Sequence, residues 1–141
     1  MIDKEIDSVL REIKDFPNKG INFKDITSLL LYPKLGSKIL DSLAAKLNST
    51  KLDAIVGVES RGFLFGYSLA MKLQIPFVPA RKGGKLPGPV VRTKYSLEYG
   101  QAILEIHKND IKSDWNILIH DDLLATGGTA VAASELIKML G

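Results

Sequence analysis

The sequence predicts an α/β fold with a mainly parallel central sheet and helices on both faces. Short apolar runs typical of buried strands alternate along the chain with amphipathic segments typical of helices. Such alternation produces crossover connections, which build parallel sheets covered on both faces. Because 141 residues suffice for one substantial core, we expect a single domain over 1–141.

The expected elements follow one another in a regular order. Apolar residues at helical spacing predict a helix over 3–14, which a segment with Pro and Gly (16–20) ends, and a second helix over 34–48. Beyond these we expect strand 53–58, helix 62–73, strand 76–80, strand 101–107, strand 116–121 and helix 130–140. Ligands of such sheets bind beyond the carboxyl ends of the strands. The segments that leave strands at that edge are 59–61, 81–85 and 121–129.

Composition and charge exclude several classes of function. The chain has no cysteine, and therefore no disulfide, thiolate zinc site or cysteine nucleophile. No signal-peptide core or apolar run of membrane-spanning length is present, so we expect a cytoplasmic protein that binds no membrane. The net charge of +3 is too small to indicate nucleic acid. The basic run within 81–94 suits a small anionic ligand, although a solvated loop is the simpler explanation of a charge run alone.

The strongest local signal is ILIHDDLLATGGTA, residues 117–130, in which an apolar strand ends in two aspartates and a small-residue turn opens a helix. The glycines permit close approach of a ligand, and the unpaired first amides of the helix can donate to an anion. The adjacent carboxylates of Asp121 and Asp122 are costly unless compensated, which ribose hydroxyls and a divalent cation can do. The segment therefore predicts a sugar-phosphate site, with an ordinary tight turn and solvated aspartates as the alternative.

The segment DDLLATGGT resembles the 5-phosphoribosyl-1-pyrophosphate (PRPP) binding motif of type I phosphoribosyltransferases. Three further stretches resemble the adenine phosphoribosyltransferases in order and spacing: FPNKGINFKDIT (16–27), VESRGFLFG (58–66) and RKGGKLPGPVVRTKYSLEYG (81–100). The resemblance implies a type I phosphoribosyltransferase-like fold with an adenine-side region over 1–33, a flexible lid loop over 83–99 and the PRPP-binding motif at 117–130. Family members continue past the final helix seen here, so we expect their last C-terminal strand to be missing.

The resemblance also implies a transferase of purine salvage, in which adenine and PRPP give AMP and pyrophosphate. The cofactor would be Mg²⁺, held by substrate oxygens and water rather than by direct protein ligands. The enzyme would be a homodimer. By the same resemblance, PRPP and its phosphate would be bound by Asp121, Asp122, Ala125, Thr126, Gly127, Gly128 and Thr129. Pyrophosphate would be bound by Glu59, Ser60, Arg61, Arg81, Lys82 and Lys85. In the family the peptide bond before this serine can be cis.

The remaining roles concern the base and its proton. The resemblance assigns adenine to Asn22, Phe23, Lys24 and Leu123, although an aromatic ring such as that of Phe23 packs equally well in a core. It assigns catalytic roles to Glu98, Tyr99 and Arg61. Glu98 would carry a proton at adenine N7, which requires burial to raise its pKa. Two alternatives stay open: a relative that acts on another purine, and a regulatory protein that binds PRPP or a nucleotide without turnover.

Overall fold

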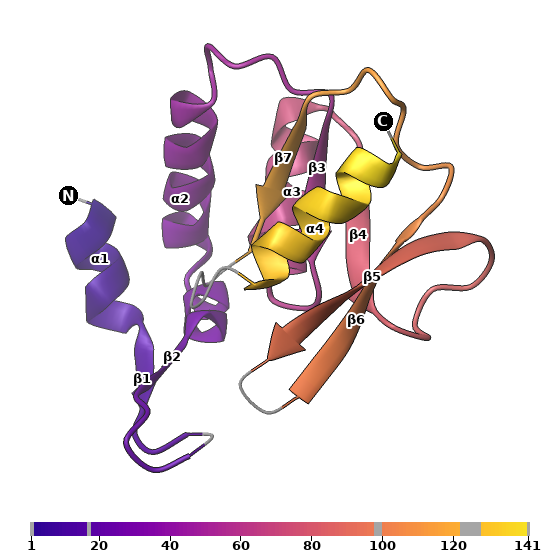
Figure 1. The fold of residues 1–141 in the computed structure, drawn as a ribbon. Helices are drawn as coiled ribbons and strands as arrows, with labels where there is room; N and C mark the ends of the chain where they lie inside the picture. Colours follow the sequence, from indigo (N-terminus) through magenta and orange to yellow (C-terminus); the bar gives the residue numbers. More distant parts are fainter. Residues whose placement is uncertain (1, 17, 98–99, 122–127, 141) are drawn as a thin grey trace. The chain divides into compact units, whose positions relative to one another are not determined.

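A computed structural model describes residues 2–16, 18–97, 100–121 and 128–140 of the chain. These residues form two compact units, Met1–Leu47 and Asn48–Gly141, each with its own elements (Figure 1). The single domain expected over 1–141 stays a prediction. Within the described ranges, no helix has the length and apolar character needed to cross a membrane.

The first unit consists of α1 (Ile2–Val9), β1 (Arg11–Ile13), β2 (Phe23–Asp25), the 3₁₀ helix η1 (Ile26–Leu31) and α2 (Pro33–Lys46). The predicted second helix is confirmed within two residues at either end. It begins at Pro33, whose fixed φ suits the first helical position.

The helix predicted over 3–14 is wrong beyond Val9. Residues 11–13 are instead a short strand that pairs antiparallel with β2. The backbone N–H of Arg11 donates to Ser28 Oγ at 2.9 Å, and its guanidinium contacts the Asp25 carboxylate at 3.0 Å. These partners are distant in sequence, so helical periodicity could not reveal them, and tertiary contacts override the local pattern.

The second unit contains β3 (Ala54–Val58), α3 (Gly62–Leu73), β4 (Phe77–Lys82), β5 (Val90–Leu97), β6 (Gly100–His107), β7 (Ile117–His120) and α4 (Gly128–Met139). The strands form one sheet in the order β5-β6-β4-β3-β7. Strand β3 runs parallel to β4 and β7, whereas β6 runs antiparallel to β4 and β5. The predicted α/β class is confirmed. The sheet is mixed rather than mainly parallel, because the antiparallel strands β6 and β5 extend it beyond β4.

Strand β5 lies within the segment 83–99 that the sequence assigned to a lid loop. It pairs with β6 along its whole length, from Val90 opposite His107 to Leu97 opposite Gly100. That prediction came from the family resemblance, with the glycines and prolines of 83–89 as hinges. The following residues, VVRTKY, nevertheless alternate β-branched or aromatic side chains with polar ones in the way that favours a strand.

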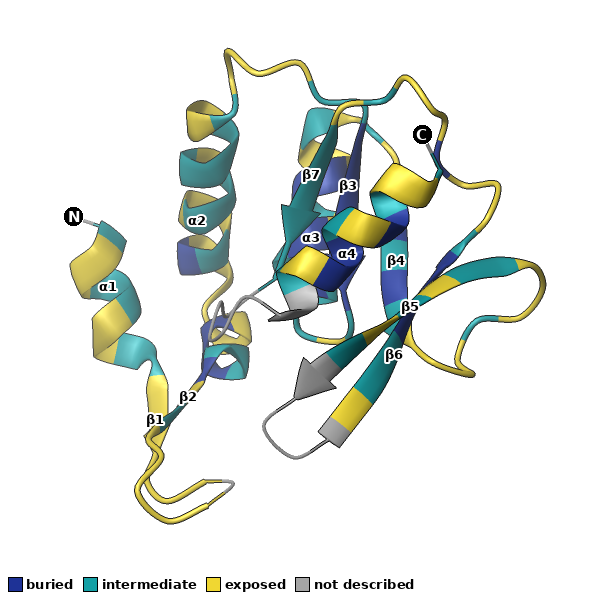
Figure 2. Ribbon diagram, in the orientation of Figure 1, coloured by how far each residue is buried: buried dark blue, intermediate teal, exposed yellow. Residues whose placement is uncertain are grey.

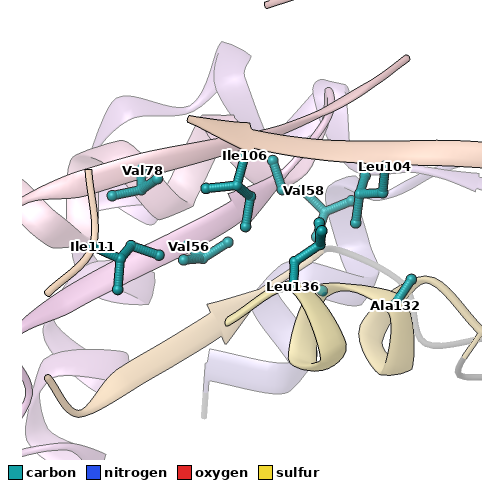
Figure 3. Close-up of a cluster of buried hydrophobic side chains, with 10 residues drawn as sticks. Val56, Val58, Val78, Leu104, Ile106, Ile111, Ala132 and Leu136 are labelled. Carbon is teal, nitrogen blue, oxygen red and sulfur yellow. The ribbon is translucent and has the colours of Figure 1, made fainter. Parts of the chain in front are cut away.

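Helices cover both faces of this sheet, with α4 in front and α3 behind in Figure 1. On the α4 face, valines and isoleucines of β3, β4 and β6 pack against Ala132 and Leu136, both almost fully buried (Figure 3). Burial is accordingly concentrated in the central strands and the inner sides of the two helices (Figure 2). The core therefore fixes the ends of β3, β4 and β7, from which the candidate site is built.

Close packing on the α3 face depends on glycine. A Cβ atom added at Gly57 of β3 would press into the Phe77 ring and lie 2.9 Å from the Gly62 carbonyl oxygen. The absence of that side chain lets α3 begin directly above the end of β3. The connection between them is consequently short and sits at the carboxyl edge of the sheet.

Candidate functional site at the carboxyl edge of the sheet

The connection after β3 and the end of β7 lie side by side. Gly62, the first residue of α3, packs so closely on β7 that an added Cβ would lie 2.8 Å from the His120 carbonyl oxygen and 3.4 Å from Asp121 Oδ1. The segment 59–61 and Asp121 therefore meet at one edge, as the sequence predicted.

The connection after β3 also contacts the end of β4. Glu59 Oε1 accepts hydrogen bonds from Arg81 Nε at 3.1 Å and from the backbone N–H of Lys82 at 3.0 Å. The Glu59 N–H in turn donates to the Ala80 carbonyl oxygen at 2.9 Å. The peptide bond between Glu59 and Ser60 is cis, as the family resemblance anticipated. Segments 59–61 and 81–85 thus converge with Asp121, the first residue of the third predicted segment, and Glu59 joins the first two.

Two opposing effects determine the pKa of the Glu59 carboxyl group, and with it the charge of the side chain. Burial by itself raises the pKa of its carboxyl group. The hydrogen bond from the Lys82 amide and the hydrogen bond and positive charge of Arg81 outweigh burial, so the pKa lies below its ordinary value of 4.5. Glu59 is therefore ionised at neutral pH. A carboxylate repels a pyrophosphate, so this geometry suits a residue that orients Arg81 and the Lys82 backbone better than one that touches the anion.

Cations surround this edge. Arg81 is partly exposed, Lys82 at the end of β4 is exposed, and so is Lys85 in the segment that follows. Arg61 is half-buried at the start of α3. Four positive side chains at this edge suit a polyanion such as a phosphate or a pyrophosphate.

Several predicted residues cannot be placed in this arrangement. Glu98, Tyr99, Asp122, Leu123, Ala125, Thr126 and Gly127 lie outside the described residues. Gly128 opens α4, which agrees with a helix that begins at the end of the predicted phosphate loop, while the side chain of Thr129 is not described. The roles assigned to all of these residues stay predictions.

The predicted adenine residues that are described belong to the first unit. Phe23 begins β2 and is half-buried, with its ring packed edge-on against Phe16 at a centroid distance of 5.1 Å. Lys24 lies opposite Glu12 in the β1–β2 ladder, and both Lys24 and Asn22 are exposed. A role of these residues in binding a base stays a prediction.

The sequence interpretation missed Glu105 of β6, which is only 3% exposed. The available signal was an acid within the apolar strand QAILEIH. Among the described residues, no three acidic, histidine or cysteine side chains gather in a way that could hold a metal ion.

The sequence was compared with known protein families. Residues 30–141 match the phosphoribosyl transferase domain family. The chain therefore belongs to the phosphoribosyltransferase family, and the structure has the fold of that family.

Relatives within the family are similar along nearly the whole chain. The adenine phosphoribosyltransferase of Malacoplasma penetrans is 53% identical over 98% of this chain and 80% of its own length. The crystal structure of adenine phosphoribosyltransferase from Thermoanaerobacter pseudethanolicus covers 100% of this chain and 81% of its own, with 48% identity and a TM-score of 0.96. The Saccharomyces cerevisiae enzyme, solved with an iminoaltritol bisphosphate and adenine, is 43% identical over 99% of this chain and 81% of its own, with a TM-score of 0.92.

Proposed function

We propose that this protein transfers the phosphoribosyl group of PRPP to adenine, releasing AMP and pyrophosphate. The observation that carries the proposal is the convergence of segment 59–61, Arg81, Lys82 and Asp121 at one sheet edge in a member of the phosphoribosyltransferase family. The relatives named above supply the choice of adenine, since they are adenine phosphoribosyltransferases.

This reaction needs no protein nucleophile. It requires that the two substrates be positioned and that the charge of the departing pyrophosphate be stabilised. The bond between the anomeric carbon of PRPP and a pyrophosphate oxygen breaks while positive charge develops on the ribose, and adenine N9 bonds to that carbon. Preorganised cations that bind the departing pyrophosphate lower the barrier because they stabilise the charge that develops on it. Arg81, Lys82 and Lys85, together with Arg61, are proposed to do this.

The ribose and the base are proposed to be held by the other predicted residues. Asp121 and Asp122 would accept hydrogen bonds from the ribose hydroxyls, and the loop that leads into α4 would bind the 5′-phosphate. As N9 bonds to the ribose, the base must give up a proton. Glu98 is proposed to manage that proton at N7, which requires that substrate binding raise its pKa.

The proposal includes Mg²⁺ as the cofactor. Substrate oxygens and water would hold the ion, and Asp121 places carboxylate oxygens at the edge where PRPP would bind, where they could accept from the waters that Mg²⁺ retains. When bound with the substrate, Mg²⁺ would neutralise part of the pyrophosphate charge. The homodimer and the cytoplasmic location predicted from the sequence remain proposals of the same kind.

Turnover with several bases tests the proposal. The protein is incubated with PRPP, Mg²⁺ and either adenine, hypoxanthine, guanine or xanthine, and the nucleotide product is identified by chromatography. We expect AMP from adenine and no product from the other bases. Product from another base would show a different specificity, and PRPP binding without turnover on any base would show a regulatory binder instead.

A further inference from the structure

The cations Lys82 and Lys85 are the two ends of one tight turn. The Lys85 N–H donates to the Lys82 carbonyl oxygen at 3.3 Å, and Gly84 adopts a φ of +83°, which favours glycine. The Gly83 N–H donates to the Ile103 carbonyl oxygen of β6 at 2.9 Å. The spacing of the two exposed ammonium groups therefore depends on the conformation of this turn.

The buried carboxylate of Glu105 accepts a hydrogen bond from the backbone of this turn. Glu105 of β6 lies opposite Arg81 of β4 and opposite Arg92 of β5 in the two ladders. Its Oε1 accepts a hydrogen bond from the Gly84 N–H at 2.9 Å, and its Oε2 lies 3.2 Å from Arg92 Nη2. An ionised carboxylate at 3% exposure is costly unless such donors compensate it, so its position is tightly defined.

We propose that Glu105 is a positioning residue for pyrophosphate, since it fixes the turn that presents Lys82 and Lys85. The inference rests on the proposed function, which gives those two cations their ligand. Glu59, just after β3, holds Arg81 and the Lys82 amide, and Glu105 of β6 holds Gly84, so two carboxylates fix the same cationic segment. Cations that are ordered before the ligand arrives lose less conformational entropy on binding.

Two substitutions at Glu105 distinguish the effect of its hydrogen bond with Gly84 from the effect of its ion pair with Arg92. Glu105→Met removes both contacts with a side chain of similar length and leaves no buried charge. Glu105→Gln retains an acceptor for the Gly84 N–H but removes the charge that faces Arg92. The control is Glu135→Gln on α4, where an exposed glutamate accepts from Thr93 Oγ1 of β5 at 3.2 Å and thus contacts the same strand without touching the turn.

Calorimetry compares two ligands for each folded variant: magnesium pyrophosphate, and AMP, whose proposed contacts do not include the turn. We expect Glu105→Met to raise the Kd for pyrophosphate about tenfold, the scale of one lost hydrogen bond to a charged group. Glu105→Gln should raise it less, Glu135→Gln should not change it, and AMP affinity should stay as in the wild type. If the methionine variant does not fold, the glutamine variant provides the same comparison.

Wild-type pyrophosphate affinity in the folded variants would overturn the inference and leave the proposed function standing. An equal loss of AMP and pyrophosphate affinity would overturn it as well, because that result indicates general damage. If the unaltered protein binds neither ligand and forms no AMP, the proposed function fails and the inference fails with it.

Discussion

Replacing Glu59 with glutamine tests the role assigned to the carboxylate at the end of β3. The amide oxygen of glutamine can still accept from the Lys82 N–H, which lies 3.0 Å from Glu59 Oε1, but the ion pair with Arg81 at 3.1 Å is lost. The Glu59 side chain is 14% exposed and that of Arg81 35%, so solvent partly screens the pair. We expect a loss of about 1–2 kcal/mol in the free energy of unfolding, between the values for exposed and buried pairs.

The pH dependence of this loss has a definite sign. Because the pKa of Glu59 is lower in the folded protein than its ordinary value of 4.5, the ionised carboxylate stabilises the fold above pH 4.5. That contribution disappears as the pH falls through the lowered pKa. The difference in stability between the wild type and Glu59→Gln should therefore be constant near neutral pH and shrink in acid.

Urea unfolding at a series of pH values measures this difference, and steady-state kinetics of the reverse reaction measure the KM for pyrophosphate. With Arg81 no longer held, we expect that KM to rise about tenfold, equivalent to about 1.4 kcal/mol. Glu12→Gln, at an exposed position of β1, is the matched control. Equal stability of the variant and the wild type at neutral pH, or a difference that grows in acid, would refute the reasoning.

Three further predictions concern single residues. Glu98→Gln should lower kcat for AMP formation by about 10²-fold or more with little change in the KM for adenine, and an unchanged kcat in steady-state assays would remove the proton role. Asp122→Asn should raise the Kd for PRPP measured by calorimetry about tenfold while the melting temperature stays the same, whereas unaltered affinity would contradict the ribose contact. Gly57→Ala should lower the free energy of unfolding by about 2 kcal/mol in urea titrations, since the new Cβ meets the Phe77 ring and the Gly62 carbonyl; a neutral substitution would show that α3 can shift.

The elements of the second unit that could be predicted are those whose signal is local. The apolar run that forms β3 is buried at every position, and the helix predicted over 62–73 is α3. Runs of this kind identify buried strands because both faces of the sheet are covered. The edge where the candidate site lies follows from the same pattern, since parallel strands present their carboxyl ends together.

What the sequence did not reveal depends on partners far apart in the chain. The strand at 11–13 exists because residues 23–28 bond to it, and no local pattern of apolar residues records that pairing. The orientation of Glu59 toward Arg81, and of Glu105 toward Gly84, is likewise a result of ladder register. A register cannot be read from one strand alone, because a shift of one residue exchanges the faces of the sheet.

A crystal structure of the protein with AMP and magnesium pyrophosphate tests the central claim most directly. We predict pyrophosphate oxygens within hydrogen-bonding distance of Lys82, Lys85 and Arg61, with Glu59 still bonded to Arg81. A pyrophosphate bound elsewhere in the molecule, or an edge of β3 and β4 that stays empty at saturating ligand, would contradict the account.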